Sequence, residues 1–165
     1  MTEWFRRNAG IVVFRADRKV LLCQRNDMPD SWQFPQGGIE DGETPQQAAA
    51  RELCEETSLQ GLQRIATLTE AARYHFPPDV IASMKKRGFN NAGQDMYWSL
   101  FYFDGNDDEI NLNTETPEFK AIKWTSLEEA VELAVDFKKP AYEKMYQAFR
   151  KLIEEYQAYT VLIKI

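Results

Sequence analysis

Residues 37–59, GGIEDGETPQQAAARELCEETSL, join a glycine-containing loop to a segment that has the features of a helix. Thr44 is a suitable N-cap, Pro45 suits the first helical position, and Gln47 completes a capping box three residues after the cap. We therefore expect a helix to begin at Pro45 and to run to about Thr57. This stretch constrains the fold most, because a turn, a cap and a helix follow one another at fixed positions.

The expected helix carries three carboxylates, Glu52, Glu55 and Glu56, at i, i+3 and i+4. This spacing places them side by side on one helix face, where like charges repel each other. Arg51 supplies one positive charge there, and divalent cations are candidates for the rest, because all-oxygen ligands suit hard ions such as Mg²⁺. The opposite face is expected to contain Ala50, Leu53, Cys54 and Thr57.

The alternative is that this glutamate-rich helix is simply a solvated face, which is the usual role of a charged run. Three neighbouring features favour a functional site instead. Gly37 and Gly38 allow the backbone to approach a ligand closely, and their loop leads into a helix N-terminus, where anions often bind. Glu43 and Arg51 stand between the glycines and the carboxylates.

The amino-acid composition and the net charge restrict the kinds of protein that this chain can be. The 165 residues are 44% hydrophobic and 28% charged, which predicts one globular domain over residues 1–165. A net charge of −6 argues against a protein that coats nucleic acid, although a protein that handles only a chain end or a nucleotide remains compatible. Two cysteines, no signal-like N-terminus and no long apolar run predict a cytoplasmic protein that does not enter a membrane.

The remaining segments predict an α/β protein in which a mixed sheet is packed between helices. Strands are expected at 10–15, 19–24, 32–38, 62–71, 96–103 and 119–124. Ser126 with Glu129 predicts a second capping box and a short helix, and a longer helix is expected to open at Pro140. Residues 75–95, with paired prolines and Gly/Asn turn signals, are expected to be the longest excursion from regular structure. The tail 159–165 has strand composition.

Eight positions match the spacing G-x5-E-x7-R-E-U-x-E-E-x-x-U, in which U is a bulky aliphatic residue; they are Gly37, Glu43, Arg51, Glu52, Leu53, Glu55, Glu56 and Leu59. The chain therefore resembles the Nudix hydrolases, whose fold is an α-β-α sandwich. Ser58 departs from the pattern, which has Gly at this position. Because helices often end in a left-handed residue, Ser58→Gly is expected to be neutral or stabilising.

A second block, SWQFPQGG at residues 31–38, resembles bacterial RNA pyrophosphohydrolases and the related dinucleoside polyphosphate hydrolases. The resemblance implies that Glu52, Glu55, Glu56 and the carbonyl of Gly37 hold Mg²⁺, for which Mn²⁺ can substitute. Glu118 would be a further ligand or the group that activates water. Arg51 would orient the carboxylates by charge-assisted hydrogen bonds, and Glu43 would brace the loop through Arg51.

The resemblance also implies a set of substrate contacts, although each of these residues has an alternative role as ordinary surface. Arg6 and Lys138 are candidates for phosphate contacts, and Arg25 and Phe137 for stacking on a base. The remaining candidates are Gln33, Gln36, Gln94 and Tyr74. The triplet Lys85-Lys86-Arg87 either steers RNA phosphates or is a solvated loop.

The activity implied is conversion of a 5′-triphosphate RNA end to a 5′-monophosphate with release of pyrophosphate, which promotes mRNA decay. The alternative is hydrolysis of diadenosine tetraphosphate or another dinucleoside polyphosphate, and a further alternative is a non-catalytic nucleotide sensor. The sequence leaves open any activating protein partner and the oligomeric state.

Overall fold

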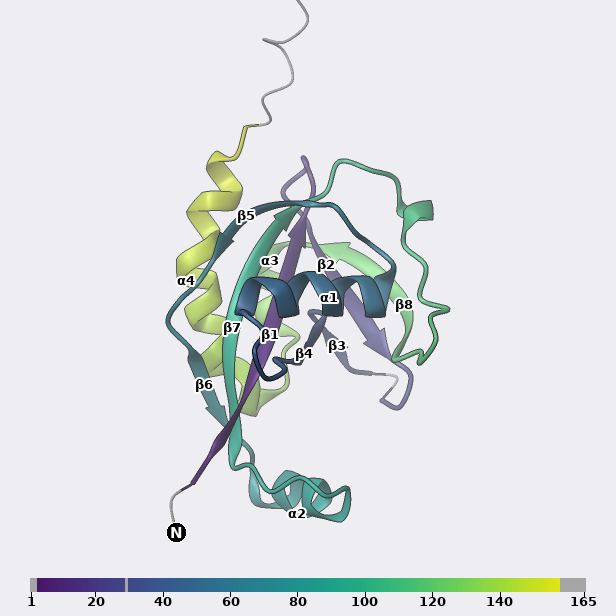
Figure 1. The fold of residues 1–165 in the computed structure, drawn as a ribbon. Helices are drawn as coiled ribbons and strands as arrows, with labels where there is room; N and C mark the ends of the chain where they lie inside the picture. The colour runs from purple at the N-terminus through teal and green to yellow at the C-terminus, as the bar shows by residue number, and fades with distance from the viewer. Residues whose placement is uncertain (1–2, 29, 158–165) are drawn as a thin grey trace, which may run out of the picture.

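A mixed β-sheet organises the computed structural model, which describes residues 3–28 and 30–157 (Figure 1). Its strands are β1 (Phe5–Phe14), β2 (Val20–Arg25), β3 (Trp32–Gln33), β4 (Gln36–Gly38), β5 (Gln63–Thr67), β6 (Ala72–His75), β7 (Gly93–Tyr102) and β8 (Phe119–Thr125). The helices are α1 (Pro45–Thr57), α2 (Pro78–Lys86), α3 (Leu127–Glu132) and α4 (Lys139–Glu155), with short 3-10 turns η1 (Asp107–Glu109) and η2 (Asp136–Lys138). None of the described helices has both the length and the apolar content needed to cross a lipid bilayer.

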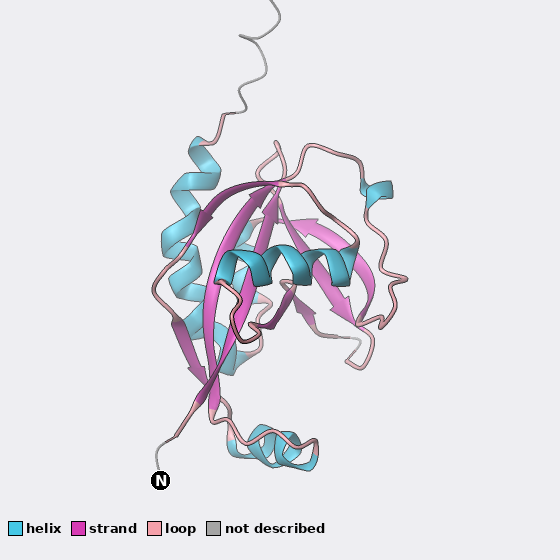
Figure 2. Cartoon of the chain, in the orientation of Figure 1, coloured by secondary structure: helices cyan, strands magenta, loops and turns pink. Residues whose placement is uncertain are grey.

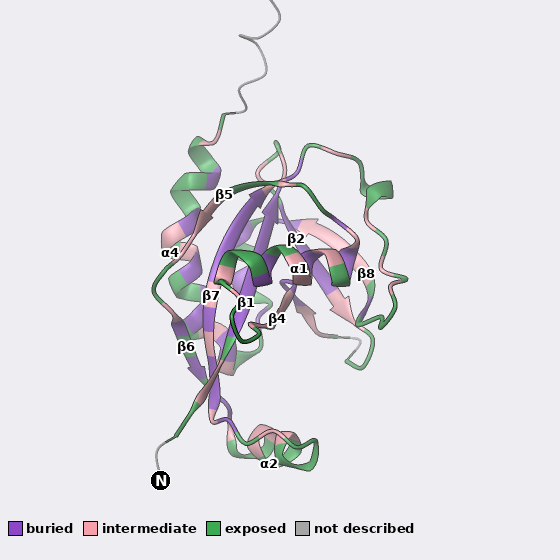
Figure 3. Cartoon of the chain, viewed as in Figure 1, coloured by how far each residue is buried: buried purple, intermediate pink, exposed green. Residues whose placement is uncertain are grey.

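The centre of the sheet is the parallel pair of β1 and β7, which is in register from Phe5 opposite Gly93 to Phe14 opposite Tyr102. The strand order is β3-β2-β1-β7-β5, with β4 also paired to β1, β6 to β7 and β8 to β2, all antiparallel. Parallel strands at the centre of a sheet are normally covered on both faces. Figure 3 accordingly shows β1 and β7 as largely buried.

Helices cover both faces of this sheet. Alternate side chains of a strand point to opposite faces. Ile11 and Val13 pack with Leu53 of α1, whereas Val12 and Phe14 belong to a second apolar cluster with residues of α3 and α4. The α-β-α sandwich expected from the sequence is therefore confirmed.

The helix expected at Pro45 is confirmed, and both hydrogen bonds of the Thr44–Gln47 capping box are present. Its faces differ from the expectation at two positions. Ala50 is exposed, whereas Glu56 is buried with only 6% of its surface accessible. The carboxylates therefore do not form one solvated face, because Glu56 turns towards the sheet.

The segment 75–95 is more regular than expected. It contains the end of β6, the helix α2 and the start of β7. The expectation of an irregular segment was wrong because Pro77 and Pro78 act as helix openers: Pro77 is the N-cap of α2 and Pro78 its first residue, where a missing N–H costs nothing. Figures 1 and 2 show α2 below the sheet, apart from the other helices.

Side chains fix the ends of the other helices. Ser58 follows α1 in the left-handed conformation, with φ 70°, and its hydroxyl donates to the carbonyl of Asn111 at 2.8 Å. Ser126 caps α3 by accepting from the N–H of Glu129. Only this half of the expected capping box forms, because the Glu129 carboxylate bonds the hydroxyl of Thr125 instead.

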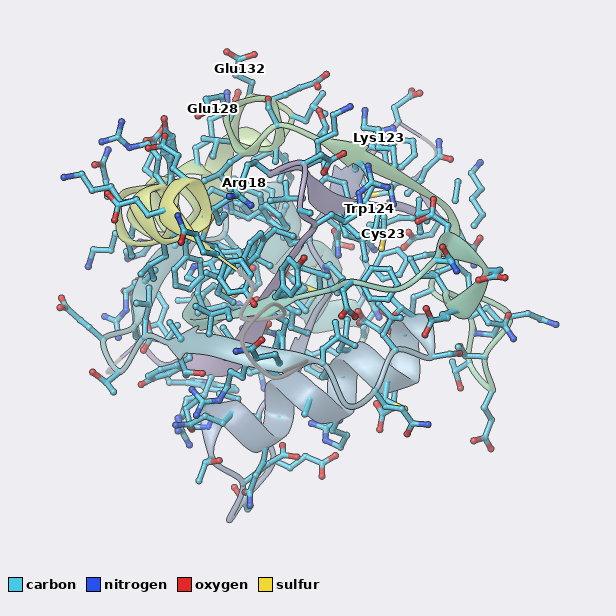
Figure 4. The ribbon with its side chains drawn as sticks, turned by 90° about the horizontal axis from the view of Figure 1, so that it is seen from above. Arg18, Cys23, Lys123, Trp124, Glu128 and Glu132 are labelled. Carbon is cyan, nitrogen blue, oxygen red and sulfur yellow. The ribbon has the colours of Figure 1, made fainter. Side chains whose placement is uncertain are left out.

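The remaining connections brace the sandwich at its upper end. Arg18, in the turn between β1 and β2, donates to the carbonyl of Tyr156 after α4 at 2.7 Å (Figure 4). The expected strand at residues 159–165 lies outside the described residues.

Candidate active site

Arg51 of α1 joins the glycine-containing loop to the carboxylates. Its Nε and Nη2 donate to both oxygens of Glu43, at 2.7 and 2.9 Å, and Nη2 also donates to the carbonyl of Gly38 at 2.8 Å. Nη1 donates to Glu52 at 2.8 Å and to Glu55 at 3.2 Å. Bonding to Arg51, followed by the backbone N–H of Glu40, lowers the pKa of Glu43 to about 2. One guanidinium thus holds loop and helix in a single geometry.

The carboxylate of Glu52 lies against the backbone of Gly37. A β-carbon at Gly37 would collide with that carboxylate, so no larger residue fits there without rearrangement. Partial burial raises the pKa of Glu52, and the hydrogen bond from Arg51 opposes this effect. The need for Gly at this position is therefore steric: the absence of a side chain lets the carboxylate of Glu52 lie against the backbone of Gly37.

Glu56 is the most deeply placed of the three helix carboxylates. Burial, followed by the charges of Glu118 and Glu52, raises the pKa of Glu56 to about 10. Its Oε2 atom is buried and has no hydrogen-bond partner among the described residues. A buried carboxylate surrounded by others remains neutral unless a positive group is brought to it.

These side chains converge on one cavity of about 490 Å³, which Glu52, Glu55, Glu56, Glu115 and Glu118 line with Cys54. Four of the five carboxylates were expected from the sequence. Glu115 was missed, because nothing in its local sequence distinguishes it from an ordinary loop residue. Glu118 also lines a second cavity of about 340 Å³, here called the cleft.

The cavity suits a divalent cation in its chemistry. Within the described residues, no three acidic, histidine or cysteine side chains are arranged as a ready cluster for an ion. In this geometry the guanidinium of Arg51 bonds both Glu52 and Glu55 and holds them in ion pairs. The Oε2 atom of Glu56 has no hydrogen-bond partner among the described residues, and the Glu52 carboxylate lies against the backbone of Gly37, so these residues supply oxygen atoms of the kind that such an ion prefers.

The cleft brings together three of the residues expected to contact substrate, Arg25, Gln33 and Gln36, with the expected metal ligand or base Glu118. The guanidinium of Arg25 forms a double ion pair with Asp27, at 2.8 and 2.6 Å, which holds it at the rim. The Oε1 atom of Gln36 is buried without a partner in the described part of the chain.

The cleft is tied to the loop that carries Glu118. The backbone N–H of Asn26 donates to the carbonyl of Glu118 at 2.9 Å, and the Asn26 side chain donates to the carbonyl of Pro117 at 3.1 Å. Arg25 and Glu118 therefore lie on two segments that are bonded directly to each other.

Four other expected contacts lie away from the cleft: Tyr74, Gln94 and Lys138 are buried, and Phe137 is half-buried. The hydroxyl of Tyr74 donates to Oε1 of Gln94 at 2.6 Å, and the ring of Tyr74 lies 5.8 Å from that of Phe137. Burial raises the pKa of Tyr74. Burial, with a smaller effect of the charge of Arg25, lowers the pKa of Lys138 to about 8. None of these residues lines the cleft itself, so the structure does not bring the whole expected set to one surface.

Arg6, on β1, packs against the glycine-containing loop. Its guanidinium rests against Gly38 and stands 5.6 Å from the centre of the Phe89 ring. Arg87, at the end of α2, contacts the same ring and lines the cleft. The sequence singled out Arg87 only as part of a basic triplet, and Phe89 was missed, because the approach of α2 to the cleft depends on the tertiary fold.

The described part of the chain also has a larger hollow, of about 790 Å³, lined by residues that include Gln63, Tyr102 and Tyr156. None of the residues of the carboxylate cavity lines it. The chemistry of the protein therefore points to the smaller pair of cavities that share Glu118.

A sandwich fold, a glycine-containing loop and a carboxylate-bearing helix bound by one arginine define a Nudix domain. The family model described as NUDIX domain matches residues 4–149. The chain belongs to this family and is a Nudix hydrolase; enzymes of this family generally use a divalent metal.

Sequence relatives of the chain include a plant Nudix hydrolase and a bacterial RNA pyrophosphohydrolase. The chain is 44% identical over 151 residues to Nudix hydrolase 26, chloroplastic, of Arabidopsis thaliana, a match that covers 89% of this chain and 70% of that protein. It is 40% identical over 148 residues to the RNA pyrophosphohydrolase of Zymomonas mobilis, covering 88% of this chain and 94% of the relative. Among solved structures, the E. coli dihydroneopterin triphosphate pyrophosphohydrolase is similar in fold, with a TM-score of 0.65 at 22% identity, covering 88% of this chain and 99% of the other.

Proposed function

We propose that the protein is a Mg²⁺-dependent RNA pyrophosphohydrolase that converts a 5′-triphosphate RNA end to a 5′-monophosphate. The observation that carries the proposal is the sharing of Glu118 between the carboxylate cavity and the cleft that Arg25 borders. A polyphosphate in the first cavity would place the attached nucleoside in the second. Relatives from Zymomonas mobilis, Acidiphilium cryptum and Caulobacter vibrioides, 39–40% identical, are named RNA pyrophosphohydrolases.

In this proposal Glu52, Glu55, Glu56, Glu118 and the carbonyl of Gly37 would hold Mg²⁺, or Mn²⁺ in its place. Bound Mg²⁺ supplies positive charge to the phosphate oxygens and lowers the pKa of an attacking water. Arg51 keeps the carboxylate of Glu52 pointed at Gly37. Glu118 is either a ligand or the base that takes the proton of the water, and its position between the cavities suits both roles.

The residues at and near the cleft are the candidates for contacts with the nucleotide. Arg25, fixed by Asp27, offers a planar guanidinium on which a base can stack, and Phe137 is the candidate for the opposite side. Arg6 and Lys138 are the candidates for phosphate oxygens. Although the chain as a whole is acidic, Arg6 rests against Gly38 of the glycine-containing loop and would give a polyphosphate there a local counter-charge.

The experiment that tests the proposal compares kcat/KM for a triphosphorylated RNA of two or more nucleotides with kcat/KM for diadenosine tetraphosphate. A higher value on RNA supports the proposal, and a clearly higher value on diadenosine tetraphosphate replaces it with dinucleoside polyphosphate hydrolysis. Glu52→Gln and Glu56→Gln should each lower kcat by several orders of magnitude with an unchanged circular dichroism spectrum. Near-normal turnover by either folded variant would contradict the site, and no turnover by the wild type would support a nucleotide sensor.

A further inference from the structure

The end of α2 is held in a defined conformation that presents two side chains to the substrate region. The N–H of Phe89 donates to the carbonyl of Met84 at 2.9 Å, and the N–H of Gly88 donates to that of Lys85 at 3.0 Å. Together with the left-handed φ of 89° at Gly88, these bonds form a Schellman motif. Arg87 and Phe89, on either side of the glycine, are therefore fixed by backbone bonds.

Phe89 stands between two guanidinium groups. The centre of its ring lies 5.6 Å from the guanidinium carbon of Arg6 and 5.9 Å from that of Arg87. Neither arginine forms an ion pair within the described residues, so both charges are available to an anion. A guanidinium that packs by its face on an aromatic ring keeps its N–H donors at the edge free.

The two arginines lie at different parts of the site. Arg6 rests on Gly38, beside the loop that leads to the carboxylates, whereas Arg87 lines the cleft with Arg25. Arg87 is also near enough to Asp27 to help lower the pKa of that carboxyl, after the larger effect of the hydrogen bond from Arg25. Arg87 is thus an unpaired cation at the nucleoside side of the site.

We propose that Arg87, positioned by Phe89, binds the first internucleotide phosphate of RNA and thereby selects RNA over dinucleoside polyphosphates. The inference rests on the proposed function and deepens it. With the 5′-polyphosphate at the carboxylates and a base at Arg25, the next anionic group of an RNA is its 3′-phosphodiester. A dinucleoside polyphosphate has no such group, because all its phosphates lie in one chain between two 5′ oxygens. The forked donors of an arginine suit the oxygens of a phosphodiester.

Kinetics on three substrates test this assignment: a triphosphorylated dinucleotide, the corresponding nucleoside triphosphate and diadenosine tetraphosphate. Arg87→Ala should lower kcat/KM on the dinucleotide about tenfold, mainly through a higher KM, and leave the other two within about twofold. The slope of log kcat/KM against log salt should also become shallower by about 0.7 on the dinucleotide. The matched control is Lys86→Ala, which removes the same charge from the neighbouring residue but does not line the cleft; it should behave as the wild type. An equal loss on all three substrates, or no loss on the dinucleotide, would overturn the assignment.

Two further measurements separate this inference from the proposed function. Gly88→Ala retains the side chains of Arg87 and Phe89 but strains the left-handed turn that positions them, so it should reduce the preference for the dinucleotide and spare the nucleoside triphosphate. Binding of the products, a 5′-monophosphorylated dinucleotide and a nucleoside monophosphate, reports on Arg87 without hydrolysis. If the wild type fails to hydrolyse RNA, the proposed function fails. Independently of hydrolysis, the role of Arg87 fails if Arg87→Ala binds the two products with the same ratio of Kd values as the wild type.

Discussion

Replacing Glu56 by glutamine should stabilise the metal-free protein at pH 7.5 while it removes the activity. The pKa of Glu56 is raised from 4.5 to about 10 in the folded chain, chiefly by burial. Between these values the folded state keeps the proton and the unfolded state releases it, so the contribution of Glu56 to stability is fully present below pH 4.5 and is lost as the pH rises. Each pH unit in this window costs about 1.4 kcal/mol, or about 2 kcal/mol between pH 6.0 and 7.5.

The assay is urea unfolding in EDTA at the two pH values, for the wild type and for Glu56→Gln. The wild type should lose about 2 kcal/mol of unfolding free energy on going to pH 7.5, and the variant, which has no proton to release, should lose much less. Glu55→Gln makes the same chemical change at a side chain that is 57% exposed, so it should retain the slope of the wild type. Saturating Mg²⁺ should flatten the wild-type slope, because an ion that binds only the folded chain favours the ionised carboxylate. Parallel slopes for the wild type and Glu56→Gln in EDTA would refute the reasoning.

Three other changes test separate parts of the structure. Ser58→Gly relieves a left-handed residue but loses the bond to Asn111, so the two effects of about 1 kcal/mol should nearly cancel and leave Tm within a few degrees; a large fall would contradict the balance. Tyr74→Phe leaves the buried acceptor of Gln94 unpaired and should cost about 1–3 kcal/mol in urea unfolding, and an unchanged midpoint would show that water replaces the hydroxyl. Because the pKa of Lys138 is about 8, its charge is present below that pH and lost above it, so kcat/KM should fall above pH 8; in Lys138→Arg this fall should disappear if the charge of Lys138 is its cause.

The helix and its cap were predictable from the sequence because local chemistry decides them. Thr44, Pro45 and Gln47 specify the start of α1 without help from the rest of the chain. The spacing of the glutamates also predicts that they are neighbours. It does not predict that Glu56 is buried while Glu55 is exposed, because that depends on which face the sheet covers.

The helix α2, in contrast, was not predictable from the sequence. Paired prolines are compatible both with an irregular segment and with the start of a helix. The structure shows that Pro77 and Pro78 start a helix. The approach of Arg87 to the cleft depends on contacts between segments about 60 residues apart in the chain, which periodicity and turn signals do not encode. Short-range rules therefore predicted which helix carboxylates lie together at the candidate site, whereas the placement of Arg87 in the cleft wall depends on the tertiary fold.

The hydrogen bonds from Asn26 to the backbone of Pro117 and Glu118 connect the cleft to the loop that carries Glu118. This connection affects which kinetic parameter should reveal discrimination between substrates. A nucleoside that fits badly beside Arg25 would displace Asn26, and this strain would pass through the two hydrogen bonds to the loop that carries Glu118, the proposed ligand or base. Wrong substrates should consequently react slowly even when they saturate the enzyme, so discrimination will be visible in turnover number as well as in affinity.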